Sequence, residues 1–123
     1  MNKNGRYAFY GTLRHGIEYH SIYTKGMDFL QSVLLRGYRL YSLGDYPYAV
    51  RSDSGCIVAD LYKVNDPEIS LSIHLMELEA GYYYDEIIID SLSFGIYLFE
   101  SPSPGDEEIR SGDWVRYVAE NGF

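Results

Sequence analysis

The stretch Tyr7-Ala8-Phe9-Tyr10-Gly11-Thr12-Leu13-Arg14 joins a short apolar segment to a glycine turn near the start of the 123-residue chain. Its aromatic and small apolar residues predict a strand over residues 6–10, which Gly11 then breaks. A strand that ends in a tight glycine turn can present backbone N–H groups to an anionic ligand. Ordinary turns share this pattern, so the stretch alone does not separate a binding loop from a simple connection.

The composition is that of a globular protein. Hydrophobic residues make up 46% of the chain and charged residues 23%, so we expect a single domain over residues 1–123 with a core that needs no disulfide or metal. The single cysteine, Cys56, excludes an internal disulfide. The fourteen tyrosines supply large apolar surfaces that end in a hydroxyl. Such side chains suit the walls of a hydrated pocket as well as a core.

The charge balance argues against several classes of partner. Ten basic residues stand against eighteen acidic ones, a net charge of −8, so we expect binding neither to nucleic acid nor to an anionic membrane surface. There is no apolar run of about 18 residues, and residues 1–5 lack the apolar core of a signal peptide. A soluble cytoplasmic protein is therefore expected. His15 and His20 lack an accompanying acidic motif, so we expect no metal site.

Local sequence signals predict one helix among several strands. Asp66 is a helix N-cap followed by Pro67 at the first helical position, and Gly81 supplies a stop after Glu79. Apolar and β-branched stretches predict strands over residues 32–41, 48–50, 56–64, 83–89 and 94–99, with a polar link at 51–55 and a bend or bulge at Gly37. Together these elements predict an α+β fold, a small mixed β-barrel of about six to seven short strands with one main α-helix packed on it.

The predicted helix places one carboxylate among apolar residues. At about 100° per residue, a broad apolar arc is formed by Ile69, Leu71, Ile73, Leu75, Met76 and Leu78. Glu79 falls in the middle of this arc, whereas Ser70, His74 and Glu77 fall on the opposite face. A carboxyl buried in the last helical turn should have a raised pKa, because burial and the helix dipole both disfavour its charge. Glu79 thus fits a general acid/base, unless the helix frays first and its side chain bends out to solvent.

An ordered set of motifs resembles the γ-glutamylcyclotransferase-like proteins, the group that includes the AIG2-like proteins and the γ-glutamylamine cyclotransferases. Tyr10-Gly11-Thr12-Leu13 is similar to the signature loop of that family, and residues 75–79, followed by Gly81 and Tyr84, resemble the helix end that carries its catalytic glutamate. The segments 37–41, 46–47, 57–62 and 112–114 follow in the same order, so the resemblance covers roughly residues 6–117.

The resemblance implies a small mixed barrel that cyclises γ-glutamyl amides to 5-oxoproline without cofactor or metal. Glu79 would be the catalytic acid/base, and the substrate would contact Tyr10, Gly11, Thr12, Leu13 and Tyr84. The short chain is more similar to the γ-glutamylamine branch, so a small γ-glutamyl compound is the expected partner. Three positions depart from the usual residues: Ala59, Met76 and Asp85 stand where the family commonly has glycine, aspartate and arginine.

Two functions from different classes remain compatible with these residues. The first is a γ-glutamyl cyclotransferase, in which backbone amides around Gly11 hold the glutamyl end and Glu79 moves the proton. The second is a non-catalytic domain of the same fold that binds a γ-glutamyl or related carboxylate ligand. An enzyme that uses the same glutamate on a different amide is a third possibility. Nothing in the sequence indicates the oligomeric state or the amine portion of the substrate.

Overall fold

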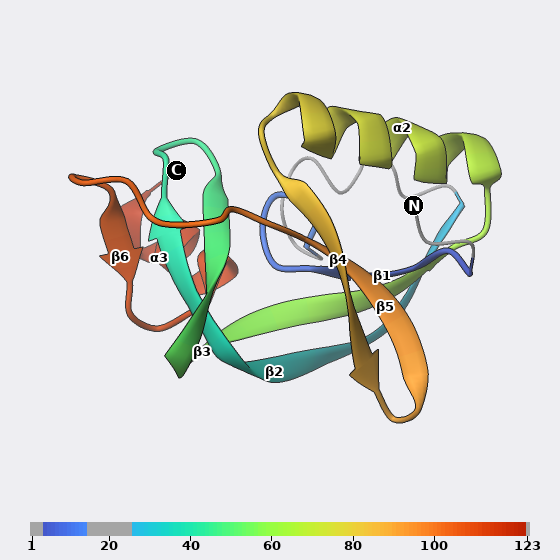
Figure 1. Cartoon of the computed structure of the whole chain (residues 1–123), viewed down its shortest axis with the longest axis horizontal. Helices are drawn as coiled ribbons and strands as arrows, with labels where there is room; N and C mark the ends of the chain where they lie inside the picture. The colour runs from blue at the N-terminus through green and yellow to red at the C-terminus, as the bar shows by residue number, and fades with distance from the viewer. Residues whose placement is uncertain (1–3, 15–25, 123) are drawn as a thin grey trace.

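The structure is a computed structural model that describes residues 4–14 and 26–122. Its elements, in chain order, are β1 (Arg6–Phe9), β2 (Met27–Ser42), β3 (Pro47–Val64), α2 (Pro67–Glu79), β4 (Tyr83–Ile89), β5 (Leu92–Leu98), β6 (Glu107–Ile109) and α3 (Trp114–Asn121). The strands form one mixed sheet in the order β4-β5-β1-β3-β2-β6. The sheet curls into a half-barrel with α2 lying along one face (Figure 1). The predicted α+β fold, a helix packed on a curled mixed sheet, is confirmed.

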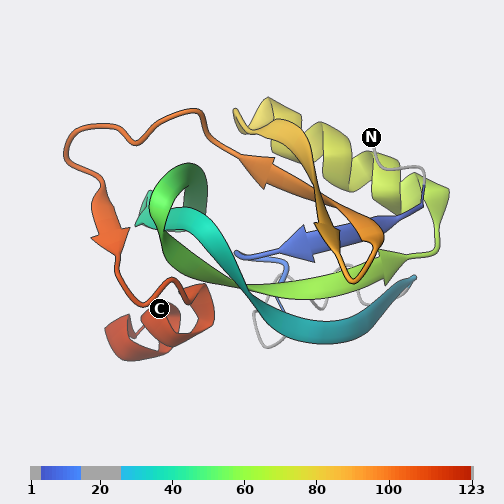
Figure 2. The ribbon, with the colours of Figure 1, turned by 60° about the horizontal axis from the view of Figure 1, so that its bottom comes forward.

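The β2–β3 hairpin is longer and more continuous than the sequence predicts. Residues 51–55, predicted as a polar link, belong to β3. The register shifts between Arg36 and Tyr38, where Gly37 has φ +92°, so the predicted irregularity at Gly37 is confirmed. Because this bulge lets both strands bend without breaking their pairing, the hairpin curves through the whole sheet (Figure 2).

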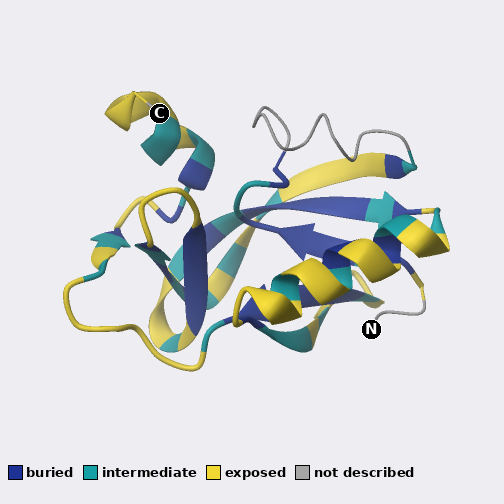
Figure 3. Ribbon diagram, turned by 90° about the horizontal axis from the view of Figure 1, so that it is seen from above, coloured by how far each residue is buried: buried dark blue, intermediate teal, exposed yellow. Residues whose placement is uncertain are grey.

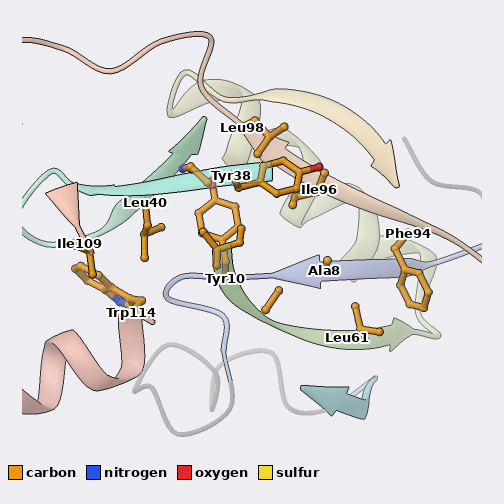
Figure 4. Packing of buried hydrophobic residues seen from close by; sticks show 13 residues of the cluster. Ala8, Tyr10, Tyr38, Leu40, Leu61, Phe94, Ile96, Leu98, Ile109 and Trp114 are labelled. Carbon is orange, nitrogen blue, oxygen red and sulfur yellow. The ribbon is translucent and has the colours of Figure 1, made fainter. Parts of the chain in front are cut away.

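Strand β1 lies at the centre of the sheet and separates two core clusters. Ala8 pairs with Leu61 of the antiparallel β3, and Tyr7 pairs with Gly95 of the parallel β5. Since successive side chains of a strand point to opposite faces, Tyr7 belongs to the cluster on the α2 side, and Ala8 to the cluster inside the curl. Figure 4 shows the ring of Tyr10 within the inner cluster.

The bounds of α2 follow the predicted capping residues. The Asp66 side chain accepts a hydrogen bond from the Glu68 backbone N–H, Pro67 is the first helical residue, and Gly81 at φ +101° follows the helix end. The predicted helix bounds are therefore confirmed.

The predicted orientation of α2 is wrong. The face that meets the sheet contains Ser70 and Ile73, which are 5% and 0% exposed, and Glu77 lies on the same side. Glu79 is exposed. Ile73 is buried as predicted, but four other residues of the predicted buried arc face outward (Figure 3), with exposed fractions of 38–55% for Leu71, Leu75, Met76 and Leu78.

The tyrosines of the sheet explain this orientation. The Tyr7 hydroxyl lies 2.7 Å from the Ser70 hydroxyl, and the Tyr97 hydroxyl lies 2.9 Å from Nδ1 of His74. The sheet face beneath α2 therefore offers polar partners as well as apolar ring surface. Because buried polar groups are stable when hydrogen-bonded, the polar stripe of the helix packs inward. Its leucines, which have no side-chain polar group to pair, face solvent.

The C-terminal helix α3 is short and packs against the inner core cluster through Trp114, Tyr117 and Val118. Asp113 is its N-cap and accepts a hydrogen bond from the Arg116 backbone N–H. Trp114 is 1% exposed and packs in the inner core cluster. Within residues 4–14 and 26–122, neither helix is both long and apolar enough to cross a lipid bilayer.

Candidate active site

A cavity of about 510 Å³ lies between the end of β1 and the end of α2. Four parts of the chain supply its wall: the β1 end with the following loop, the turn before β3, the last turn of α2 with the residues after it, and β5. The lining residues from these segments are Ala8, Phe9, Tyr10, Gly11, Thr12, Leu13, Asp45, Tyr46, Pro47, Met76, Glu77, Ala80, Tyr82 and Tyr97. The predicted loop Tyr10–Leu13 is therefore part of a cavity wall.

Glu77 is the carboxylate that shares this cavity with the loop. Its side chain is partly buried at the cavity wall, and this burial raises the pKa of Glu77 from 4.5 to about 7. Among the described lining residues, the other charged side chain is Asp45, at the exposed turn. A carboxyl that titrates near neutrality inside a cavity can both accept and release a proton under ordinary conditions.

Buried tyrosines surround Glu77 and give the cavity a hydroxyl-rich wall. Burial, together with the nearby Glu77 charge, raises the pKa of Tyr82, and the pKa of Tyr97 is raised chiefly by burial. The Tyr82 hydroxyl donates to the carbonyl oxygen of Pro47. These hydroxyls therefore stay protonated and add no charge to the wall, and the Tyr82 proton is held by the Pro47 carbonyl oxygen.

Tyr10 fixes the start of the loop. Its hydroxyl donates to the Tyr97 carbonyl oxygen at 2.5 Å and accepts from the Ala49 backbone N–H at 3.1 Å. Next to it, Gly11 packs so closely on Pro47 that an added Cβ would lie 3.0 Å from the proline ring. Glycine at position 11 therefore suits the close approach of two chain segments, because a side chain there would push against the Pro47 ring.

A buried ion-pair network holds the other end of the loop. The Arg14 backbone N–H donates to the Gly11 carbonyl oxygen at 3.0 Å and closes the turn. Its guanidinium donates from Nε to Oδ2 of Asp60 at 3.2 Å and from Nη1 to Oδ1 of Asp113 at 2.6 Å. Arg14 is 7% and Asp60 1% exposed. The loop is therefore tied to both β3 and the N-cap of α3, which preorganises its backbone.

The structure separates the predicted site residues. Tyr10, Gly11, Thr12 and Leu13 line the cavity. Glu79 and Tyr84 are not among the described lining residues. The Tyr84 ring packs against His74 and Tyr97, and its hydroxyl donates to Glu86. The residues that sequence reasoning missed are Glu77, Tyr82 and Tyr97. The sequence did contain a signal for Glu77. Its helical spacing places it on the same face of the helix as Ser70 and His74, and these two polar side chains pair with tyrosine hydroxyls of the sheet.

The three positions that depart from the family pattern have different surroundings. Met76 lines the cavity, whereas Ala59 is fully buried in the inner core cluster. Asp85 forms an ion pair with Arg51 on β3, and this pairing together with the Glu86 backbone N–H lowers the pKa of Asp85 despite its partial burial. Of the three departures, Met76 alone touches the described cavity wall.

A metal site finds no support in the described residues. Across those parts of the chain, no three His, Cys, Asp or Glu side chains form a group that could hold a metal ion. His15 and His20 lie outside the described residues.

Comparison with known proteins gives consistent results in sequence and in structure. The profile of the family described as "Gamma-glutamyl cyclotransferase, AIG2-like" matches residues 7–116. A Pyrococcus horikoshii protein, PH0828, whose name assigns it provisionally to the gamma-glutamylcyclotransferases, is 39% identical over 115 residues, which are 91% of this chain and 92% of the relative. The gamma-glutamylcyclotransferase family protein YtfP of Escherichia coli is 29% identical over 111 residues, which are 89% of this chain and 96% of YtfP.

Solved structures of both relatives share this fold. The crystal structure of PH0828 superposes with a TM-score of 0.80 at 33% identity and covers 95% of each chain. The solution structure of YtfP superposes with a TM-score of 0.73 at 29% identity, over 91% of this chain and 97% of YtfP. An aig2-like protein of Mus musculus, at 16% identity and a TM-score of 0.60 over 81% of this chain and 80% of that one, shares the fold.

Proposed function

We propose, given that the chain belongs to the gamma-glutamyl cyclotransferase, AIG2-like family, that it cyclises a γ-glutamyl amide to 5-oxoproline and releases the free amine. In this proposal Glu77, and not Glu79, carries the proton. The observation that supports this assignment is the position of Glu77, which lines the same cavity as Gly11 and Thr12 and has a pKa raised by burial to about 7.

The proposed reaction needs a folded substrate and one proton carrier. The α-amine nitrogen attacks the γ-carbonyl carbon, the new N–C bond closes the five-membered ring, and the bond to the leaving amine breaks. Because the attack is intramolecular, binding the glutamyl chain in a bent conformation supplies much of the acceleration. The backbone around Gly11 and Thr12 would hold the anionic oxygens, and its anchoring through Tyr10 and Arg14 keeps it in place.

Glu77 would take the proton from the substrate ammonium and deliver it to the leaving amine. An α-ammonium has a pKa of about 8 and an ordinary glutamate about 4.3, so proton transfer to an ordinary glutamate is uphill by more than three orders of magnitude. The raised pKa of Glu77, about 7, reduces that disadvantage to about tenfold. The same carboxyl is then acidic enough to protonate the amine as it leaves.

The test compares Glu77→Gln with Glu79→Gln, two conservative changes two residues apart on one helix. Each variant is incubated with γ-glutamyl amides that differ in the amine portion, and 5-oxoproline is measured by mass spectrometry. We expect Glu77→Gln to lose at least about 10²-fold in kcat, and Glu79→Gln to retain the wild-type rate. Full activity in Glu77→Gln would overturn the assignment. Binding of the amides by the wild type without any product would instead favour a non-catalytic binding domain.

A further inference from the structure

The Tyr97 hydroxyl connects the cavity wall to a histidine of α2. Tyr97 lines the cavity together with Glu77, and its hydroxyl lies 2.9 Å from Nδ1 of His74. The pKa of Tyr97 is raised by burial first, and also by its interactions with Tyr7 and with the Glu77 charge. The hydroxyl and the Glu77 carboxyl therefore lie within electrostatic reach of each other.

His74 lies between this hydroxyl and solvent. It is partly exposed, whereas Tyr97 is 3% exposed. Residues three apart on a helix are neighbours on its surface, so His74 and Glu77 occupy adjacent turns of the helix face that meets the sheet. Burial lowers the pKa of His74 below its usual 6.5. The imidazole is therefore neutral near pH 7 and able to accept a proton.

Aromatic rings of the sheet hold the imidazole in place. The ring centroids of His74 and Tyr97 are 5.8 Å apart, and the Tyr84 ring meets the imidazole edge-on at 5.7 Å. The Tyr84 hydroxyl donates to Glu86 on the same strand. Among the described residues no ion pair joins His74 to a carboxylate, so Glu77, Glu86 and the two tyrosines are the titratable groups that face it.

The proposed reaction moves two protons, whereas Glu77 holds one at a time. The α-ammonium of the substrate carries three hydrogens, and the lactam nitrogen of 5-oxoproline keeps one of them. The first proton leaves before the nitrogen attacks, and the second leaves as the ring closes. The leaving nitrogen takes one proton when its bond to carbon breaks. A second acceptor lets the ring nitrogen release its proton while Glu77 still carries the first.

We propose that Tyr97 and His74 form a proton path from the cavity to solvent, and that this path takes the second proton. The Tyr97 oxygen receives a proton from the cavity as its own hydrogen passes to Nδ1 of His74, so Tyr97 stays uncharged. The imidazolium then returns to its neutral form by giving a proton to solvent, where the released amine becomes an ammonium. His74 acts through Tyr97 and is a positioning residue. This inference rests on the proposed function and adds a second proton route to it.

The test separates proton transfer from hydrogen bonding at His74. His74→Asn offers the Tyr97 hydroxyl an acceptor near the position of Nδ1, but an amide takes up no proton. kcat and KM for 5-oxoproline release are measured with the wild type, His74→Asn, Tyr97→Phe and the double variant. The control is Ser72→Asn, which places the same residue at an exposed position of α2.

We expect His74→Asn to lose about tenfold in kcat, less than the loss of a direct acid/base group, with KM unchanged. Ser72→Asn should keep the wild-type kcat. Because Tyr97 and His74 act in one path, the double variant should be no slower than Tyr97→Phe alone. Urea denaturation shows whether each variant is folded.

Rescue by imidazole supplies a readout that a purely structural role would not move. His74→Ala leaves space for a free imidazole beside the Tyr97 hydroxyl. Imidazole in the buffer should therefore restore most of the lost kcat in His74→Ala, and should leave Tyr97→Phe unchanged because the hydroxyl that passes the proton is missing.

Failure of this path is distinguishable from failure of the proposed function. A wild-type kcat in His74→Asn, a folded His74→Ala that imidazole does not rescue, or losses that multiply in the double variant would overturn the path and leave the cyclisation standing. An absence of turnover in the wild type would overturn the proposed function. Nitrogen NMR then still tests the path: it requires a neutral His74 with its hydrogen on Nε2 and an Nδ1 resonance that moves in Tyr97→Phe, and a hydrogen on Nδ1 would overturn it.

Discussion

Replacement of Glu77 by glutamine should stabilise the protein at alkaline pH while it removes activity. In the folded state the pKa of Glu77 is raised from 4.5 to about 7 because the carboxyl is buried. Below pH 4.5 both the folded and the unfolded chain carry the proton, so Glu77 does not lower the free energy of unfolding. Between pH 4.5 and 7 the unfolded chain releases its proton and the folded chain keeps it, so the free energy of unfolding falls. Above pH 7 the loss is complete.

The magnitude follows from the difference between these two pKa values. A difference of about 2.5 pH units at about 1.36 kcal/mol per unit gives about 3 kcal/mol. Because Glu77 is partly exposed, solvent screening reduces the expected effect to about 1–3 kcal/mol. Glutamine has a similar shape and does not titrate, so Glu77→Gln should be more stable than the wild type by this amount at pH 8 and by almost nothing at pH 4.

Urea denaturation at pH 4 and pH 8 measures the effect, since the difference between variant and wild type cancels the titration of all other groups. Glu79→Gln is the matched control, because Glu79 is exposed, and we expect it to change the free energy of unfolding by less than about 0.5 kcal/mol at both pH values. An equal effect of Glu77→Gln at pH 4 and pH 8 would refute the reasoning.

A pH–rate profile should show activity rising with an apparent pKa near 7, the value expected for Glu77.

Three further variants test the anchoring of the loop and the packing of the chain. Arg14→Met leaves the buried Asp60 without its cation and should cost about 3–5 kcal/mol in urea denaturation; a loss below 1 kcal/mol would contradict its burial. Tyr10→Phe removes the hydroxyl that bridges backbone groups of β3 and β5 and should cost about 1–3 kcal/mol; an unchanged Tm would contradict this. At Gly112 an added Cβ would lie 2.0 Å from a backbone oxygen, so Gly112→Ala should destabilise by several kcal/mol more than Gly105→Ala, where nothing lies within 4 Å. Equal losses at the two glycines would show that the contact does not exist.

Local chemistry predicts those parts of the fold and the site that depend on neighbouring residues in the chain. The ends of α2 follow from Asp66, Pro67 and Gly81, because caps and helix stops act within a few residues. The strand and glycine turn of Tyr10–Leu13 follow from local signals, whereas the expectation that this loop contacts a substrate came from the family resemblance; the loop lines the cavity. The overall sheet follows from the apolar segments, since each must bury its side chains against another.

The face that a helix presents to the core depends on residues far away in the chain. Apolar residues surround most of α2, so its own sequence favours no single inward face, and the partners in β1 and β5 decide. Ser70 finds the hydroxyl of Tyr7 across 63 residues of chain, a contact that no local pattern contains. The same limitation affects β4, where Ile88 reads as a core residue but is 70% exposed, because it points to the face opposite Ile87 and Ile89, which pack on the inner core cluster.

The central position of β1 has a consequence for how the chain folds. β1 pairs with β3 on one side and with β5 on the other, and its pairing with β5 joins Tyr7 to Gly95. Such distant pairing is slow, because a long loop must close before the contact forms. Until β5 pairs with β1, one edge of β1 stays open. The candidate-site loop at the end of β1 is held by Asp60 and Asp113 through Arg14, so its final position depends on chain segments that lie far from it in the sequence.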